Sequence, residues 1–196
     1  MRLILVRHGE TTWNRAGLYQ GWKDTNLTAS GREAARTIGA RLRRAGVTRF
    51  DLWASDLRRA VSTARIAFGR DPRMDRRLRE LDFGVFAGRT YDENLWRFGD
   101  RFVSWEEHRG RAAPPGCEGL DDFSSRIVGW LEDVHGGTPS DRTVVAVTHG
   151  GVVRALVRPF VCDEHRPENG EITVLRWQEK RRHPTVTRWL PAGDRG

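Results

Sequence analysis

The chain has 196 residues, a length that suits one domain with a sizeable core, and 38% of them are hydrophobic while 31% are charged. No apolar run approaches the roughly 20 residues of a membrane helix, and charge interrupts the N-terminal run at Arg7, too early for a signal peptide, so we expect a cytoplasmic protein without membrane contact. The net charge of +8 is dispersed among 26 acidic residues, which argues against nucleic acid as a partner and is consistent with a small anionic substrate.

The cysteine content gives no support for a metal or a disulfide. Cys117 and Cys162 are the only cysteines, and neither belongs to a Cys-x-x-Cys pair or lies near histidines at ligand spacing. We therefore expect two reduced thiols, no structural zinc, and no metal or other cofactor.

Apolar runs alternate with helical patterns along the chain. Continuous apolar runs predict buried strands, and apolar residues at helical spacing predict helices. Thr28 or Ser30 should cap the first helix and Gly46 should end it, while Ser55-Asp56 should cap the second. The predicted elements are, in chain order, strand 3–6, helix 28–45, strand 50–54, a helix from the 55–56 cap to about 68, helix 120–134, strand 143–148, a helix from 150 to about 160, strand 171–178 and strand 185–190.

This alternation predicts an α/β fold with a mostly parallel central sheet and helices on both faces. Residues 1–196 contain no internal repeat and no linker, so we expect a single domain. The stretch 90–119 is less regular and rich in Trp, Arg and Gly, which indicates an irregular helical lid or excursion beside the site. The two closing strands leave a homodimer open.

Three of the predicted strands end in residues that suit an anion site. The first ends in Arg7-His8-Gly9, the second in a run that includes Arg58 and Arg59, and the strand 143–148 in His149-Gly150-Gly151. In open α/β sheets, ligands bind beyond the carboxyl ends of the strands. If these strands are parallel neighbours, two histidines and at least two arginines meet at one edge.

That combination is suited to phosphoryl transfer. A neutral imidazole is a nucleophile near neutral pH, arginines bind phosphoryl oxygens with a bidentate fork, and a glycine at a helix start lets a phosphate approach the backbone. The leaving oxygen also needs a proton, which a carboxyl group in a partly desolvated pocket can supply. Glu80 in LRELDFG is the candidate, and Glu10 and Asp82 are its rivals.

Taken together, these segments resemble the histidine phosphatase superfamily, the phosphoglycerate mutase-like branch 1. The resemblance is spread over most of the chain and implies a three-layer sandwich, with most similarity to the small phosphatases of the α-ribazole phosphatase or broad-specificity type. The matching segments are, in the family's order, LVRHGETTWN, GWKDTNLTASG, ASDLRRAVSTA, LRELDFGVFAG and VVAVTHGGVVRAL.

The resemblance also implies roles for individual residues. His8 would be the nucleophile that becomes phosphohistidine, and Glu80 would be the proton donor. Arg58, next to the matching arginine, would be structural or exposed. The rest of the phosphate pocket would be Arg7, Arg59 and His149, and secondary substrate contacts would come from Asn14, Gln20, Gly21 and the backbone N–H of Gly150.

The implied activity is a metal-independent phosphomonoesterase acting on a small phosphorylated substrate. The alternative is a cofactor-dependent phosphoglycerate mutase, but mutases of the family are longer between the acid loop and the second histidine, so the compact interval here favours hydrolysis. A non-catalytic phosphoprotein-binding or nucleic-acid-binding module should have lost one of the key residues, and all are present. Departures from the family pattern at Ala87, Cys117 and Gly119 leave the substrate open.

Overall fold

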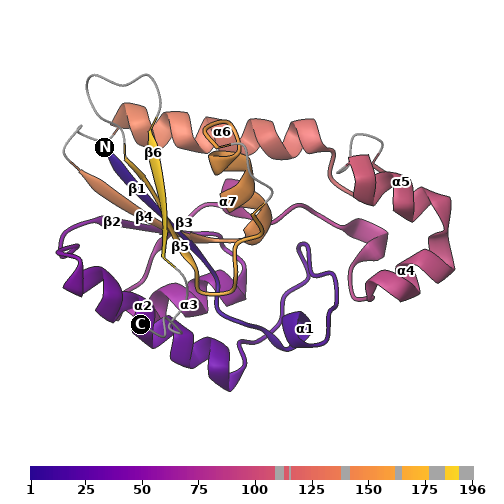
Figure 1. Ribbon diagram of the computed structural model, residues 1–196, viewed down its shortest axis with the longest axis horizontal. Coiled ribbons are helices and arrows are strands. Elements are labelled where there is room, and N and C mark those ends of the chain that lie inside the picture. The colour runs from indigo at the N-terminus through magenta and orange to yellow at the C-terminus, as the bar shows by residue number, and fades with distance from the viewer. Residues whose placement is uncertain (109–112, 115, 138–141, 162–164, 177–183, 190–196) are drawn as a thin grey trace.

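The structure of the protein is a computed structural model that describes residues 1–108, 113–114, 116–137, 142–161, 165–176 and 184–189. Its described strands form one six-stranded sheet in the order β3-β2-β4-β1-β5-β6 (Figure 1). The pairs β1–β4, β2–β4 and β2–β3 are parallel, and β5 runs antiparallel to both of its neighbours, β1 and β6. The strands are β1 (Arg2–Arg7), β2 (Asp51–Ala54), β3 (Arg73–Met74), β4 (Thr143–Thr148), β5 (Ile172–Arg176) and β6 (Thr185–Trp189).

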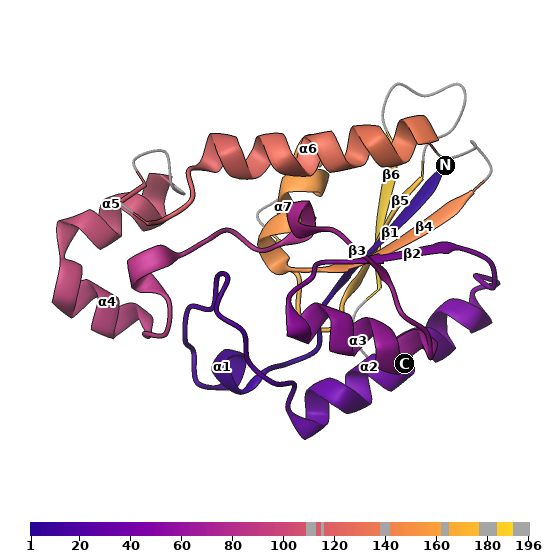
Figure 2. The ribbon, with the colours of Figure 1, turned by 180° about the vertical axis from the view of Figure 1, so that it is seen from behind.

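Helices cover both faces of this sheet, as predicted. Figures 1 and 2 show α2 and α3 on one face and α6 and α7 on the other. Within the described residues, the helices are α1 (Thr12–Arg15), α2 (Ala29–Arg44), α3 (Arg58–Phe68), α4 (Tyr91–Phe98), α5 (Asp100–His108), α6 (Leu120–Gly137) and α7 (Gly150–Val157). Among the residues described, no helix is long and apolar enough to cross a membrane.

The continuous apolar runs of β1 and β4 follow from this two-sided burial. Successive side chains of a strand point to opposite faces, so Leu3 and Leu5 belong to the core beneath α6 and α7, whereas Ile4 and Val6 belong to the core beneath α2 and α3. All four side chains are fully buried. A strand with two buried faces therefore has no polar positions until it ends, and β1 ends at Arg7.

The starts of α2 and α3 are stabilised differently. Thr28 caps α2, because its Oγ1 accepts the N–H of Gly31 at 3.0 Å. The predicted cap of the second helix was wrong: Leu57 occupies the cap position without a side-chain bond. Instead, the carboxylate of Asp24, from a distant loop, accepts the N–H groups of Arg58 and Arg59 and supplies the negative charge that a helix start favours.

The stretch 90–119 contains two short helices, α4 and α5, which lie beside the sheet beyond one end of α6 (Figures 1 and 2). Aromatic packing connects them to the body, since Phe86 meets Phe102 edge to face with ring centroids 5.2 Å apart. Trp96 of α4 is 86% exposed. Residues 109–112 and 115 of this stretch, and residues 177–183 between β5 and β6, lie outside the described residues.

Candidate active site

The three strands that end in the suggestive residues are direct neighbours, because β4 lies between β1 and β2. Arg7 is aligned with Thr148 at the ends of β1 and β4. Just beyond, the N–H of His8 donates to the carbonyl of Thr148 at 2.9 Å, and the N–H of Ser55 donates to Val147 at 3.0 Å. The sheet therefore brings the carboxyl ends of these three strands to one edge, as the sequence predicts.

His8 is buried, with 3% of its surface exposed, and its ring orientation is fixed. Its Nδ1 lies 2.8 Å from the carbonyl oxygen of Gly9. Because a carbonyl can only accept, Nδ1 carries the hydrogen and Nε2 keeps its lone pair. Burial, reinforced by the positive charges of Arg59 and Arg7, holds the pKa of His8 well below its usual range, so the ring is a neutral imidazole.

The His149 ring lies against His8, edge to face, with ring centroids 5.2 Å apart. It is fully buried, and neither ring nitrogen has a hydrogen-bond partner among the described residues. Burial, with Arg59 and His8 next in importance, also lowers the pKa of His149 well below its usual range. A buried polar atom without a partner costs free energy, so these nitrogens are suited to an incoming polar group.

Arg59 is a buried cation held by backbone carbonyls. Only 1% of it is exposed, and its terminal nitrogens donate to Lys23 at 2.8 Å and Gly21 at 2.7 Å. Asp24 lies 3.6 Å from the guanidinium, and burial lowers the Arg59 pKa to about 10, so the charge persists at neutral pH. Its Nε has no partner among the described residues. The neighbouring Arg58 is exposed, as expected.

Arg7 provides a second largely buried guanidinium beside the histidines. One terminal nitrogen donates to the carbonyl of Pro167, while Nε is buried without a partner in the described part of the chain. A Cβ on Gly150 would lie 3.5 Å from that Nε, so the start of α7 packs directly against Arg7. Burial lowers the pKa of Arg7, and the negative charge of Glu80 opposes that shift.

Glu80 reaches the same place from the loop after β3. Its Oε2 accepts the N–H of Gly151 at 3.0 Å, at the start of the helix that follows His149, and its Oε1 accepts the N–H of Leu81 at 2.9 Å. A Cβ on Gly151 would overlap Oε1, so only glycine leaves room for this carboxylate. The acid is thus placed at the N-terminus of α7, two residues after His149 in the chain, where its charge acts on Arg7 and Arg59.

The rival acids are engaged elsewhere. Glu10 accepts hydrogen bonds from Thr28 and Ser30, and these lower its pKa to about 2, which makes it a poor proton donor. Asp82 accepts the N–H of Gly84 at 3.0 Å within its own turn. The geometry therefore favours Glu80 over both.

Two of the predicted secondary residues, Asn14 and Gln20, both accept hydrogen bonds from Thr11. The Oδ1 of Asn14 accepts the N–H of Thr11 at 3.1 Å, in a capping box that starts α1. The Oε1 of Gln20, a buried side chain, accepts the hydroxyl of the same Thr11 at 3.1 Å. Gly21 has φ of 52° and contributes its carbonyl to Arg59 rather than a donor to the site.

Sequence reasoning missed the segment 165–171, which holds the first histidine from the other side. The amide of Asn169 donates to the carbonyl of His8 at 3.0 Å and to Oδ1 of Asn14 at 3.2 Å. The N–H of Gly170 donates to the carbonyl of Arg7 at 3.0 Å. The only signal in the sequence is the turn-forming Asn-Gly pair before β5, which does not indicate what it contacts.

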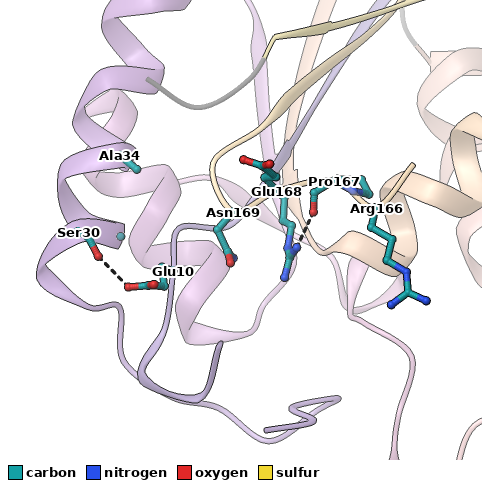
Figure 3. A pocket seen from close by; sticks show the side chains of 9 residues that line it. Glu10, Ser30, Ala34, Arg166, Pro167, Glu168 and Asn169 are labelled. Atoms are coloured by element: carbon teal, nitrogen blue, oxygen red, sulfur yellow. Dashed lines mark hydrogen bonds between the residues drawn. The ribbon is translucent and has the colours of Figure 1, made fainter. Parts of the chain in front are cut away.

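A cavity of about 450 Å³ opens beside Arg7, between α2 and the segment 166–169 (Figure 3). Figure 3 shows the Ser30–Glu10 hydrogen bond on one wall and the bond from Arg7 to Pro167 on the other. In the described part of the chain, no three His, Cys, Asp or Glu side chains are grouped as metal ligands would be.

Known proteins are similar to this chain over most of its length. The 2,3-bisphosphoglycerate-dependent phosphoglycerate mutase of Bartonella bacilliformis is 36% identical over 165 residues, which is 79% of each chain. A putative alpha-ribazole-5'-P phosphatase from Escherichia coli superposes with a TM-score of 0.81 at 27% identity, covering 97% of this chain and 95% of that one. A phosphoglycerate mutase from Thermus thermophilus superposes with a TM-score of 0.76 at 34% identity, covering 96% and 98%.

The model of one protein family matches residues 3–190, almost the whole chain. The matched stretch contains both histidines, the two buried arginines and the acid loop whose geometry is described above. The chain therefore belongs to the histidine phosphatase superfamily, branch 1.

Proposed function

We propose that this enzyme is a phosphomonoesterase that hydrolyses small phosphate esters through a phosphohistidine. The observation that carries the proposal is the pair of neutral, buried imidazoles in edge-to-face contact, 5.2 Å between centroids, beside two buried guanidiniums. A neutral imidazole with a free Nε2 is a nucleophile, and the charges of Arg7 and Arg59 favour a phosphoryl dianion at that nitrogen.

The proposed reaction has two steps. The lone pair of His8 Nε2 forms a bond to phosphorus while the bond to the ester oxygen breaks, and protonated Glu80 gives its proton to that oxygen. Water then attacks the phosphohistidine, Glu80 takes a proton from it, and inorganic phosphate leaves. Arg7, Arg59 and His149 bind the phosphoryl oxygens throughout, and Asn14, Gln20 and the start of α7 at Gly150 contribute to substrate binding.

The alternative is phosphoglycerate mutase activity, which the names of the Bartonella and Thermus relatives favour. Chain length does not separate the two activities, contrary to our expectation, because the aligned stretch is the same 79% share of this chain and of the Bartonella mutase.

A different observation supports hydrolysis. A mutase must hold a carboxylate or second phosphate as well as the transferred group. The nearby guanidiniums of Arg79 and Arg126 are already neutralised by Asp56 and Glu118, at 2.6 Å each.

The test is hydrolysis of p-nitrophenyl phosphate in EDTA by the parent enzyme and by His8→Ala. We expect the parent to be active and to yield an acid-labile phosphoenzyme, and the variant to be inactive. His135→Ala, on the exposed side of α6, is the control. Loss of parent activity in EDTA, or activity retained by His8→Ala, would contradict the proposal. Conversion of 3-phosphoglycerate to 2-phosphoglycerate in the presence of 2,3-bisphosphoglycerate would identify a mutase.

The setting of this activity is part of the proposal. We infer a cytoplasmic enzyme whose partner is a small phosphorylated molecule. The net charge of +8 is consistent with an anionic substrate, and its dispersal among 26 acidic residues argues against a nucleic-acid partner. The sheet edge at β6 is compatible with a homodimer, which light scattering of the purified protein would detect.

A further inference from the structure

Arg126 lies on α6. Every N–H group of its guanidinium binds either Glu118 or the backbone of the acid loop, the loop that carries Glu80. Its side chain is 16% exposed. Arginine has five N–H donors, and here Nε and one terminal donor bind the carboxylate of Glu118 at 2.6 and 2.8 Å. The remaining three donate to backbone carbonyls: Arg77 at 2.6 Å, Arg79 at 2.8 Å and Glu80 at 2.9 Å.

Glu118, the carboxylate partner of Arg126, also binds the backbone of the loop. Its Oε2 also accepts the N–H of Asp82 at 3.2 Å, and its own N–H donates to the carbonyl of Asp82 at 3.0 Å. The indole N–H of Trp22 adds a second donor to the carbonyl of Glu80 at 2.8 Å. The backbone on both sides of the Glu80 side chain is therefore fixed by groups from two distant parts of the chain, Trp22 and the stretch 118–126.

This arrangement has a consequence for proton transfer. The segment 79–83 belongs to no helix or strand, so regular structure does not set the direction of the Glu80 side chain. The carboxylate must nevertheless meet the N–H of Gly151 at 3.0 Å, beside His149. Since all donors of Arg126 are engaged and its charge is neutralised by Glu118, this arginine is not available as a phosphate ligand.

We propose that Arg126 and Glu118 are positioning residues, which hold the acid loop so that Glu80 can protonate the leaving oxygen. The inference rests on the proposed function, in which Glu80 is the proton donor. Lysine cannot replace Arg126, because one ammonium group has three donors and no planar fork. Displacing the Glu80 carboxyl group by even a small distance should then slow the step that needs its proton.

The leaving group distinguishes this role from a general effect on folding. p-Nitrophenolate can leave without a proton, whereas the alkoxide of propyl phosphate needs one. Loss of the proton donor should therefore lower kcat/KM far more for propyl phosphate than for p-nitrophenyl phosphate. We expect Glu80→Gln to lower kcat/KM for propyl phosphate by about 100-fold or more and for p-nitrophenyl phosphate much less. Arg126→Lys should show the same selective loss, of about 10-fold or more, and Glu118→Gln a smaller one of the same kind.

The control is Arg65→Lys, which alters another arginine–carboxylate ion pair, the exposed pair with Asp71. This variant should leave kcat/KM unchanged for both substrates. Suppose that Glu80→Gln lowers kcat/KM selectively for propyl phosphate. If Arg126→Lys and Glu118→Gln then lower kcat/KM equally for both substrates, or for neither, the positioning role is wrong. If Glu80→Gln is itself unselective, the proposed function fails instead. Should Arg126→Lys not fold, as judged by its circular dichroism and thermal melt, Glu118→Gln decides the matter by the same ratio.

Discussion

His8 and His149 meet edge to face with ring planes 62° apart and centroids 5.2 Å apart, both inside a pocket that contains two guanidiniums. A proton on either ring would be surrounded by positive charge and cut off from water. Both rings are therefore neutral in the folded protein, and their pKa values lie well below the usual range. The same pocket that keeps His8 neutral makes the fold sensitive to acid.

We predict that the free energy of unfolding falls as the pH drops below 6.5. The unfolded chain binds protons at His8 and His149 near pH 6.5, whereas the folded chain does not, so the stabilisation is complete above that pH and is lost below it. At pH 5.5 the loss is on the order of 1 kcal/mol per histidine. Urea unfolding at pH 7.5, 6.5 and 5.5 measures it, and His149→Asn should have a shallower dependence. A flat or rising stability over this range would refute the prediction.

Gly151→Ala should separate activity from stability. Alanine favours a helix by about 1 kcal/mol over glycine, but its Cβ would overlap Oε1 of Glu80, the end of a flexible side chain that can move away. We expect an unchanged or higher melting temperature and a loss of kcat/KM of about 10-fold or more. Gly129→Ala is the matched control, because a Cβ at that position of α6 has no neighbour within 4 Å. Equal activity of the two variants would show that Glu80 needs no such space.

Asp24→Ala should weaken phosphate binding and the start of α3 together. The carboxylate accepts the N–H groups of Arg58 and Arg59 and pairs with the Arg59 guanidinium at 3.6 Å. Loss of a helix cap costs about 1 kcal/mol, and a less constrained Arg59 should raise the KM for phosphate esters. Thermal melts and steady-state kinetics test both effects. Asp71→Ala, which removes an exposed partner of Arg65, is the control, and identical behaviour of the two variants would contradict the prediction.

Asn169→Ala should lower kcat because it removes the amide that joins the backbone of His8 to the side chain of Asn14. The expected loss is about 10-fold, measured by steady-state kinetics on p-nitrophenyl phosphate. Asn169→Asp should not restore activity, since a carboxylate cannot donate to the His8 carbonyl. Asn26→Ala, at an exposed position, serves as control. Recovery in Asn169→Asp would mean that the amide N–H groups do not matter.

Much of the fold could be predicted because its strands are buried on both faces. The run 143–148 coincides with β4, and Thr28 caps α2 as expected. Strand β3 was missed since its two residues are exposed and carry no apolar pattern. The need for glycine at position 9 was not predictable either: a Cβ there would overlap the carbonyl of Gly31, so the packing of α2 requires it.

The candidate site was predictable where chemistry coincides with strand ends. Parallel neighbours bring Arg7, His8 and His149 to one edge, so their position follows from local pattern and topology. The supports of the site were not predictable. Arg126 and Asn169 act on carbonyls of residues far away in the chain, and backbone carbonyls leave no signature in a sequence.

The position of β1 has a consequence for the order of assembly. Arg2 is aligned with Thr143 on one side and with Arg176 on the other, so the strand that bears His8 obtains its neighbours only from the distant half of the chain. Such long-range pairing makes folding slow. The backbone contact at Arg7 also depends on a late part of the sequence, because the carbonyl of Arg7 accepts the N–H of Gly170. A chain that ends before the segment 165–171 therefore contains His8 but lacks the contacts that hold its strand and its backbone.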